Sequence, residues 1–319
     1  MYSRFLIRLL PIFLSALLLL ALIPLGCKPS PEPKTEGDVT FTDALGRTVT
    51  VKKNPERVAA LLGSFADVWQ LSGGTLCAAA DDAWDDLGLE MGEAVNIGEM
   101  KSPSLELLLS SEPQLVLASA STASNLKMLD TLESVGITVA FFDVSCFDDY
   151  LEMLNICTDI TERKDLYEQN GLSLRERIER VKDELASTAL PEAQRKILFL
   201  RASSGFVRAK NSDGSILGEM LKDIGCINIA DSDSGLLENL SIEKILLENP
   251  YRIFIVQVGD DPEAAYANIT KMMEENPAWS ELSAIKENRL HYMDKRLFNL
   301  KPNARWAEAY EVLSEIIKQ

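Results

Sequence analysis

Few side chains in this sequence are suited to covalent or acid–base catalysis. The 319 residues contain one histidine, His291, and lack the patterns G-x-x-x-x-G-K-[ST], G-x-G-x-x-G, H-E-x-x-H and G-x-S-x-G. A Ser-His pair needs its histidine at a strand end, whereas His291 lies inside an apolar stretch that predicts a strand. A zinc or manganese ion needs several histidine or carboxylate ligands. We therefore expect a binding protein that is not an enzyme and has no cofactor or resident metal.

Polar and aromatic side chains instead follow the segments that predict strands. Trp84 lies in an acidic loop in the first half of the chain, and Arg201 and Asn299 follow predicted strands in the second half. Arg208 and Arg305 are expected nearby. Ligands of parallel sheets bind beyond the carboxyl ends of the strands. A single arginine is more often part of a surface ion pair, but three that converge in an acidic protein suit an anionic ligand.

A ten-residue pattern occurs twice and places a glutamate at the same offset in each copy. Ser, an aliphatic residue, Glu, further aliphatic residues and Pro recur at matching positions in 104–113 and 241–250. Each copy predicts a short helix that ends before proline and leads into a buried strand. Glu106 and Glu243 lie in the first helical turn, where free N–H groups favour a carboxylate. Because the pattern repeats, the two acids are also suited to a partner with two-fold symmetry.

The elements around these residues predict an α/β fold. Apolar strands that alternate with helices indicate mainly parallel sheets, and the repeat indicates two Rossmann-like lobes. No strand signal occurs from 147 to 186, where apolar residues spaced four, three and four apart predict one helix over 162–186. That helix is on the order of 35 Å long at 1.5 Å per residue and is expected to link the lobes. The expected regions are 38–146 for the first lobe, 147–190 for the helical linker and 191–319 for the second lobe.

The apolar segments and turn residues also predict individual strands and helices within these regions. A hairpin is expected over 39–52, strands over 57–62, 75–80, 137–142, 196–200 and 289–293, and a hairpin arm over 206–209. Ser64 is expected to cap a helix that ends at Leu71, and the residues from 81 to 88 are expected to form a loop. Further helices are expected over 123–135, 216–224 and 262–275.

Composition and the N-terminus indicate where the protein acts. The formal charge of −17 argues against nucleic acid as a partner. Residues 1–26 resemble a signal peptide, with Arg4 and Arg8 before an uncharged apolar stretch, and their removal takes the charge to −19. Residues 27–37 are polar and proline-rich and predict a flexible tether. The cysteines at 77, 146, 157 and 226 are expected to be buried free thiols, with disulfides left open.

The sequence resembles the lipoprotein substrate-binding components of ABC importers for iron–siderophore complexes, haem and cobalamin. The resemblance covers about Val39 to Ile317 and rests on the repeat, the long helix, Asn54-Pro55-Glu56-Arg57-Val58 and Asn276-Pro277-Ala278-Trp279. It implies a lipid on Cys27, after the cleavage-site residues Leu25-Gly26. Pro24 stands where such sites usually have leucine, and an uncleaved anchor helix is the alternative.

The resemblance also implies partners. It implies a monomer tethered at the extracytoplasmic face of the cytoplasmic membrane, which binds a metal chelate and delivers it to an ABC permease dimer with its ATPase. Glu106 and Glu243 match the family's permease-docking glutamates. A ferric siderophore is the expected ligand, with Arg201, Arg208, Asn299, Arg305 and Trp84 in the pocket. The alternatives are haem or cobalamin as the ligand, a sensory lipoprotein without transport, and a chelate-processing enzyme. The enzyme would need clustered Cys or His residues.

Overall fold

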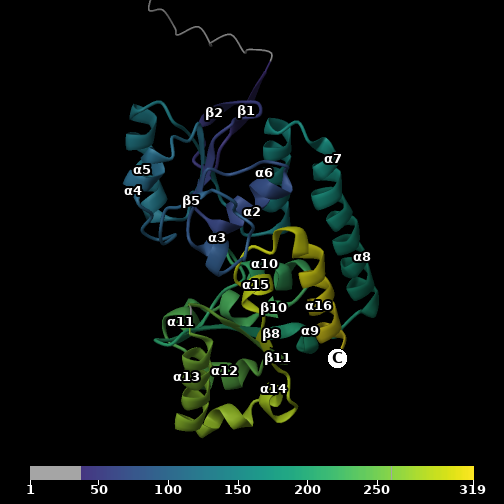
Figure 1. The fold of residues 1–319 in the computed structure, drawn as a ribbon. Coiled ribbons are helices and arrows are strands. Elements are labelled where there is room, and N and C mark those ends of the chain that lie inside the picture. The colour runs from purple at the N-terminus through teal and green to yellow at the C-terminus, as the bar shows by residue number, and fades with distance from the viewer. Residues whose placement is uncertain (1–36, 260) are drawn as a thin grey trace, which may run out of the picture. The chain divides into compact units, whose positions relative to one another are not determined.

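The computed structural model describes residues 37–259 and 261–319 (Figure 1). The expected signal peptide, Cys27 and the tether up to residue 36 lie outside the described residues. Within the described part of the chain, no helix combines the length and the apolar character needed to cross a membrane.

The described residues begin with an antiparallel hairpin and then form a five-stranded parallel sheet, here called the first sheet. The hairpin consists of β1 (Asp38–Thr42) and β2 (Thr48–Lys52). The sheet has the order β5-β4-β3-β6-β7. Its strands are β3 (Val58–Ala60), β4 (Ala78–Ala79), β5 (Val95–Asn96), β6 (Leu115–Ser119) and β7 (Thr138–Phe142).

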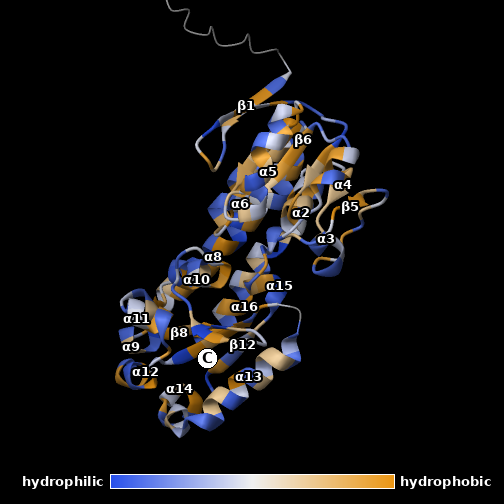
Figure 2. Ribbon diagram, turned by 90° about the vertical axis from the view of Figure 1, so that its left-hand side faces the viewer, coloured by the Kyte–Doolittle hydropathy of each residue, from blue (hydrophilic) through white to orange (hydrophobic). Residues whose placement is uncertain are grey.

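Both faces of the first sheet are buried. Along β6, Leu115 and Leu117 belong to one apolar cluster, whereas Val116 and Ala118 belong to another. Successive side chains of a strand point to opposite faces, so helices must cover both. In Figure 2 the region around β6 is mostly orange. The helices of this part are α2 (Gly63–Leu71), α3 (Asp82–Asp85), α4 (Leu105–Ser110), α5 (Ala123–Ser134) and α6 (Phe147–Ile160).

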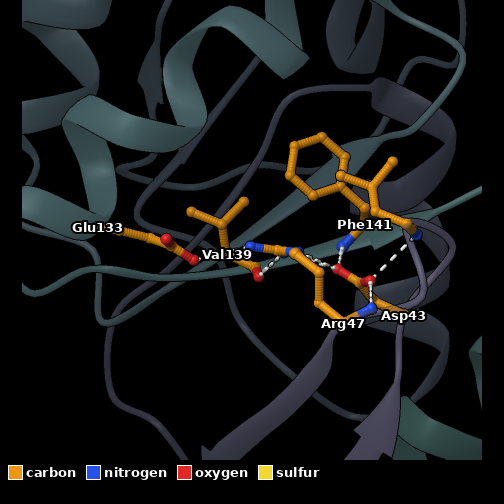
Figure 3. Close-up of polar contacts among 6 residues, drawn as sticks. Asp43, Arg47, Glu133, Val139 and Phe141 are labelled. Carbon is orange, nitrogen blue, oxygen red and sulfur yellow. Dashed lines mark hydrogen bonds and ion pairs between the residues drawn. The ribbon is translucent and has the colours of Figure 1, made fainter.

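The hairpin is attached to the first sheet by a buried ion pair (Figure 3). The loop residue Asp43 accepts hydrogen bonds from Arg47 Nη2 at 2.6 Å and from the Phe141 N–H of β7 at 3.3 Å. Arg47 also donates to Val139 O of β7 at 2.9 Å and pairs with Glu133 at 2.7 Å. Because the Asp43 side chain is 0% exposed, these bonds replace the water that the carboxylate loses on folding.

A second sheet follows, with the order β10-β8-β11-β12 in parallel and β9 antiparallel to β8. Along β11, Ile253 and Ile255 belong to a different apolar cluster from Phe254 and Val256, so this strand is also covered on both faces. The strands are β8 (Lys196–Ala202), β9 (Val207–Ala209), β10 (Ile227–Asn228), β11 (Arg252–Gln257) and β12 (Leu290–Met293).

The helices of this second part range from one turn to fourteen residues. The α-helices are α9 (Glu192–Arg195), α10 (Ile216–Asp223), α11 (Ser234–Glu238), α12 (Ile242–Glu248), α13 (Pro262–Glu275), α14 (Ser283–Lys286), α15 (Lys295–Phe298) and α16 (Trp306–Lys318). The 3₁₀ helices are η3 (Ile229–Asp231), η4 (Pro277–Glu281) and η5 (Asn303–Arg305).

The segment between the sheets is helical, as expected for 162–186. It consists of α7 (Lys164–Tyr167), the π-helical turn η2 (Glu168–Leu172) and α8 (Ser173–Thr188). A Cβ at position 171 would lie 2.9 Å from Leu151 Cδ2, so a larger residue in this π-helical turn would crowd Leu151. Arg177 of α8 pairs with Glu311 of α16 at 2.8 Å. Two mainly parallel sheets joined by this segment confirm the expected α/β class, whereas the exact domain boundaries stay a prediction.

Three local expectations were wrong. Helix α2 begins at Gly63 with Leu62 as its N-cap, and Ser64 lies inside the helix instead of capping it. The Gly63 N–H donates to Asp82 Oδ1 at 2.8 Å, so a residue far along the chain satisfies the helix start. The expected strand 75–80 is reduced to β4, and the expected loop 81–88 contains α3. The two-residue strands β5 and β10 were also missed, because they are too short to show a periodic pattern.

Candidate functional site

Arg201 lies at the carboxyl end of β8. Its Nη2 donates to Asn299 Oδ1 at 2.8 Å, so the structure brings these two predicted residues together. The side chain is partly buried, and burial lowers the pKa of Arg201 from its ordinary value. Within the described residues no carboxylate pairs with Arg201. The guanidinium is therefore a cation whose donors are incompletely used.

Arg208 lies directly opposite Arg201 on the antiparallel strand β9. Residues opposite each other in such a pair point to the same face, with Cβ atoms about 5 Å apart. Arg208 is exposed, and its guanidinium carbon lies 4.9 Å from the centroid of the Phe206 ring. Two like charges in opposite positions repel each other, and in the described structure neither is neutralised by an acid. This arrangement is suited to an anionic group that contacts both.

The other two predicted pocket residues have different surroundings. Arg305 is exposed and donates from Nε and Nη2 to the two carboxylate oxygens of Glu308, each at 2.7 Å. This hydrogen-bonded pair raises the pKa of Arg305. Its charge is thus neutralised locally. Trp84 belongs to α3, is partly buried and packs against the core of the first sheet.

Asp82 precedes Trp84 at the carboxyl edge of the first sheet. Burial raises the pKa of Asp82 to about 6, opposed by the hydrogen bond from Gly63 and helped by the charges of Asp81 and Asp86. The protein thus holds a carboxyl group near the expected ligand face at a cost in free energy. Strongly perturbed pKa values of this kind are concentrated at functional sites, although structural networks also produce them.

The sequence did not indicate that the segment after β12 contacts the first sheet's helices. Lys295 of α15 pairs with Asp86 at 2.7 Å, and Arg296 donates to Leu87 O at 2.9 Å. The buried Asn303 donates to Ser64 O and to Asp67 Oδ2, each at 2.8 Å. These contacts join residues more than two hundred positions apart.

Lys301 of the same segment was also missed. Its Nζ lies 5.5 Å from the centroid of the Phe65 ring, a cation–π distance. Burial lowers the pKa of Lys301, while the charges of Asp143 and Asp82 act in the opposite direction. Asp82 and Asp143 follow strands β4 and β7, so Lys301 lies among groups at the carboxyl edge of the first sheet.

The lone histidine lies in a strand, as the sequence predicted, and packs against an aromatic ring. His291 lies in β12 and stacks on Phe254, with ring centroids 5.3 Å apart. The next residue, Tyr292, is 48% exposed and meets Tyr266 edge-on at 5.1 Å between centroids. This exposed aromatic pair was not among the predicted pocket residues.

The repeated glutamates occupy equivalent positions in the structure. Ser104 and Ser241 cap α4 and α12 by accepting the N–H groups of the residues three positions later, at 3.3 and 3.4 Å. Each helix is followed within two residues by a residue with positive φ, which is 46° at Glu112 and 41° at Asn249. Glu106 and Glu243 are both exposed. The predicted repeat of helix, stop and buried strand is therefore confirmed.

The structure also places the cysteines and the side chains that could bind a metal ion. No cluster of three or more His, Cys, Asp or Glu side chains suited to an ion occurs among the residues described. The four cysteines within 37–319 are free; Cys157 is buried and the others are partly buried. Burial raises the pKa of Cys157 to about 12, so this thiol is unreactive at neutral pH.

A family model described as "Periplasmic binding protein" matches residues 58–297. The chain belongs to this family. Over 95% of both chains it is 24% identical to the Bacillus subtilis ABC transporter substrate-binding lipoprotein YvrC. It is 25% identical to the Fe(3+)-citrate-binding protein YfmC of Bacillus subtilis over 88% of each chain. The resemblance to substrate-binding lipoproteins of ABC importers is thereby confirmed.

Solved structures share the fold of this family member. Staphylococcus aureus SirA, complexed with staphyloferrin B, superposes with a TM-score of 0.69 at 20% identity and covers 88% of this chain and 98% of its own. The vitamin B12 binding protein BtuF of Vibrio cholerae superposes with a TM-score of 0.65 at 19% identity, covering 83% of this chain and 97% of its own. At these identities the likeness shows the fold alone.

Proposed function

We propose that the chain is the extracytoplasmic substrate-binding component of an ABC importer and that it captures an anionic metal chelate, in the first place a ferric siderophore. The observation that carries this proposal is the pair Arg201 and Arg208, opposite each other on one sheet face and unneutralised among the described residues. Guanidinium groups bind carboxylate and phenolate oxygens through paired hydrogen bonds. An acidic protein with such a pair is suited to a ligand with negatively charged oxygens.

The relatives support the same ligand class. YfmC is named for binding Fe(3+)-citrate, and SirA was solved with staphyloferrin B. Other proteins of this fold bind haem or vitamin B12, among them Staphylococcus aureus IsdE, solved with haem, and the vitamin B12 binding protein BtuF. The arginine pair favours the anionic chelate. Asn299 holds Arg201, while Trp84, Tyr266 and Tyr292 provide aromatic surface, and Arg305 would contribute only after separating from Glu308.

Replacement of the arginine pair tests the ligand class. A charge-assisted hydrogen bond is worth about 1.5–3 kcal/mol, so Arg201→Met and Arg208→Met should each weaken ferric-siderophore binding about 10- to 150-fold. Arg163→Met is the matched control, because Arg163 is an exposed arginine paired with Asp165 on α7. Titration of tryptophan fluorescence measures the affinities. Unchanged affinity in both variants would contradict the role of the pair.

Delivery is the second part of the proposal. The exposed Glu106 and Glu243 are assigned to the two permease subunits, because they have the same place on two helices of the same build. The double variant Glu106→Ala/Glu243→Ala should lose uptake of the chelate and keep the wild-type ligand affinity. Uptake at the wild-type rate in cells that carry the double variant would show that these acids do not dock.

Membrane attachment completes the proposal. We assign the lipid anchor to Cys27, in line with the relatives named as lipoproteins. Cys27→Ala should shift the chain from the membrane fraction to the soluble fraction. Retention of the variant in membranes would instead favour an uncleaved N-terminal anchor.

A further inference from the structure

We propose that the two permease-docking surfaces are unequal, and that α12 makes the stronger contact through Glu243 and Leu247 together. The inference rests on the proposed docking function and adds to it the chemistry of the partner. The permease subunit that meets α12 provides a cation and, one helical turn away, an apolar pocket. The subunit that meets α4 provides a cation only.

The first observation is the exposed leucine on α12. Leu247 is 85% exposed, whereas Ile242 and Ile245 of the same helix are buried. Glu243 and Leu247 are four residues apart, a spacing that places both side chains on one helix face. A single exposed leucine is ordinary on a protein surface. Here it adjoins the acid that the repeat already assigns to an interface.

The charges of α12 leave Glu243 as its unneutralised group. Lys244 pairs with Asp233 at 2.7 Å, and Glu248 pairs with Lys196 at 2.8 Å. Among the described residues Glu243 has no cationic partner.

The Glu243 carboxylate is also oriented. The Ser241 hydroxyl donates a hydrogen bond to Glu243 Oε2 at 2.9 Å. The hydrogen bond from its own backbone N–H and this bond from Ser241 lower the pKa of Glu243. The helix therefore presents a fixed, charged carboxylate beside an apolar side chain, and a cation beside an apolar pocket is the complementary surface.

Helix α4 has the same frame but a different surface. Ser110 is the residue at the place of Leu247, and its hydroxyl donates to Leu107 O at 2.9 Å. Leu107 is 42% exposed, but it follows Glu106 directly, and adjacent helical residues do not share a face. The Ser104 hydroxyl is not bonded to Glu106 in the described structure. The acid on α4 lacks the orienting bond, and the apolar residue on its face, Leu109 three positions later, is only partly exposed.

The test measures binding of the mature chain to its cognate permease–ATPase complex, reconstituted in nanodiscs. Leu247→Ser should weaken binding about tenfold or more, since burial of a leucine side chain contributes at least that factor. Val135→Ser is the matched control, because Val135 is 58% exposed next to α5. Glu243→Ala should weaken binding more than Glu106→Ala. Ser110→Leu, which copies Leu247 onto α4, should reduce the difference between the two helices.

The outcomes separate this inference from the proposed function. If Leu247→Ser binds like Val135→Ser, or if Glu106→Ala and Glu243→Ala weaken binding equally, the proposed difference between α12 and α4 is wrong. The docking proposal itself is not contradicted by either result. If the double variant Glu106→Ala/Glu243→Ala binds like the wild type, the docking proposal itself is overturned. Thermal unfolding of each variant shows that the fold is kept, which is expected because all five replaced side chains are exposed.

Discussion

Replacement of Asp82 by asparagine should stabilise the protein at neutral pH. Asparagine keeps the oxygen that accepts the Gly63 N–H at 2.8 Å, so the start of α2 stays satisfied. The substitution removes only the charge, which burial disfavours and which the charges of Asp81 and Asp86 disfavour further. The effect therefore reports on electrostatics with little change in packing.

The size of the effect follows from the pKa. The pKa of Asp82 rises from 3.8 to about 6 in the folded protein. The unfolded chain then binds fewer protons than the folded one between these values, so stability falls as pH rises through this window. At 1.36 kcal/mol per pKa unit the wild type loses about 3 kcal/mol by pH 7.5 but only about 1 kcal/mol at pH 4.5. Asp82→Asn avoids this loss at both pH values.

Urea unfolding followed by tryptophan fluorescence at pH 7.5 and pH 4.5 measures the difference. Asp85→Asn is the matched control, since Asp85 belongs to the same short helix and is exposed. Its unfolding free energy should stay near that of the wild type at both pH values. The reasoning fails if Asp82→Asn is less stable than the wild type at pH 7.5, or if the gain is the same at both pH values.

Two further predictions concern buried polar contacts. Arg47→Met should reduce the unfolding free energy by about 3 kcal/mol at pH 7, because it leaves the buried Asp43 without its cation. Burial raises the pKa of Asp43, but the hydrogen bonds from Arg47 outweigh it and leave the pKa lowered. The pair therefore stabilises the ionised form, and the deficit measured by urea unfolding should shrink as pH falls through that lowered pKa; a deficit independent of pH would contradict this. Asn303→Ala should cost about 2–3 kcal/mol, since it removes two hydrogen bonds and places alanine at a φ of 50°. Asn303→Gly should lose less unfolding free energy than Asn303→Ala, because glycine adopts this φ without strain. Equal losses in the two variants would assign the whole effect to the side chain.

The features that were correctly predicted depend on residues close together in the chain. The repeat was predicted because the capping serine, the aliphatic residues and the proline all lie within ten positions. The stripe of α8 was predicted from its own spacing, and Leu174, Ile178, Val181 and Leu185 are indeed buried. Arg201 and Asn299 were selected by their position after strands, and the structure joins them at 2.8 Å.

Most of the features that were missed depend on distant residues. The start of α2 is satisfied by Asp82, nineteen positions later, which no capping rule within the helix can show. The contacts of Lys295 and Arg296 with the residues after α3 span 209 positions. The pair of Arg305 with Glu308 is local. The sequence pattern nevertheless did not show which of the three predicted pocket arginines is already neutralised by an acid.

Direct titration of the purified mature chain with ligands tests the central proposal most directly. Isothermal calorimetry with ferric citrate, a ferric catecholate siderophore, haemin and cobalamin compares the candidate classes under one condition. We expect saturable 1:1 binding of a ferric siderophore, weakened at least tenfold by Arg201→Met and unchanged by Arg163→Met. Tight binding of cobalamin or haemin with no response to the ferric chelates would contradict the proposed ligand class.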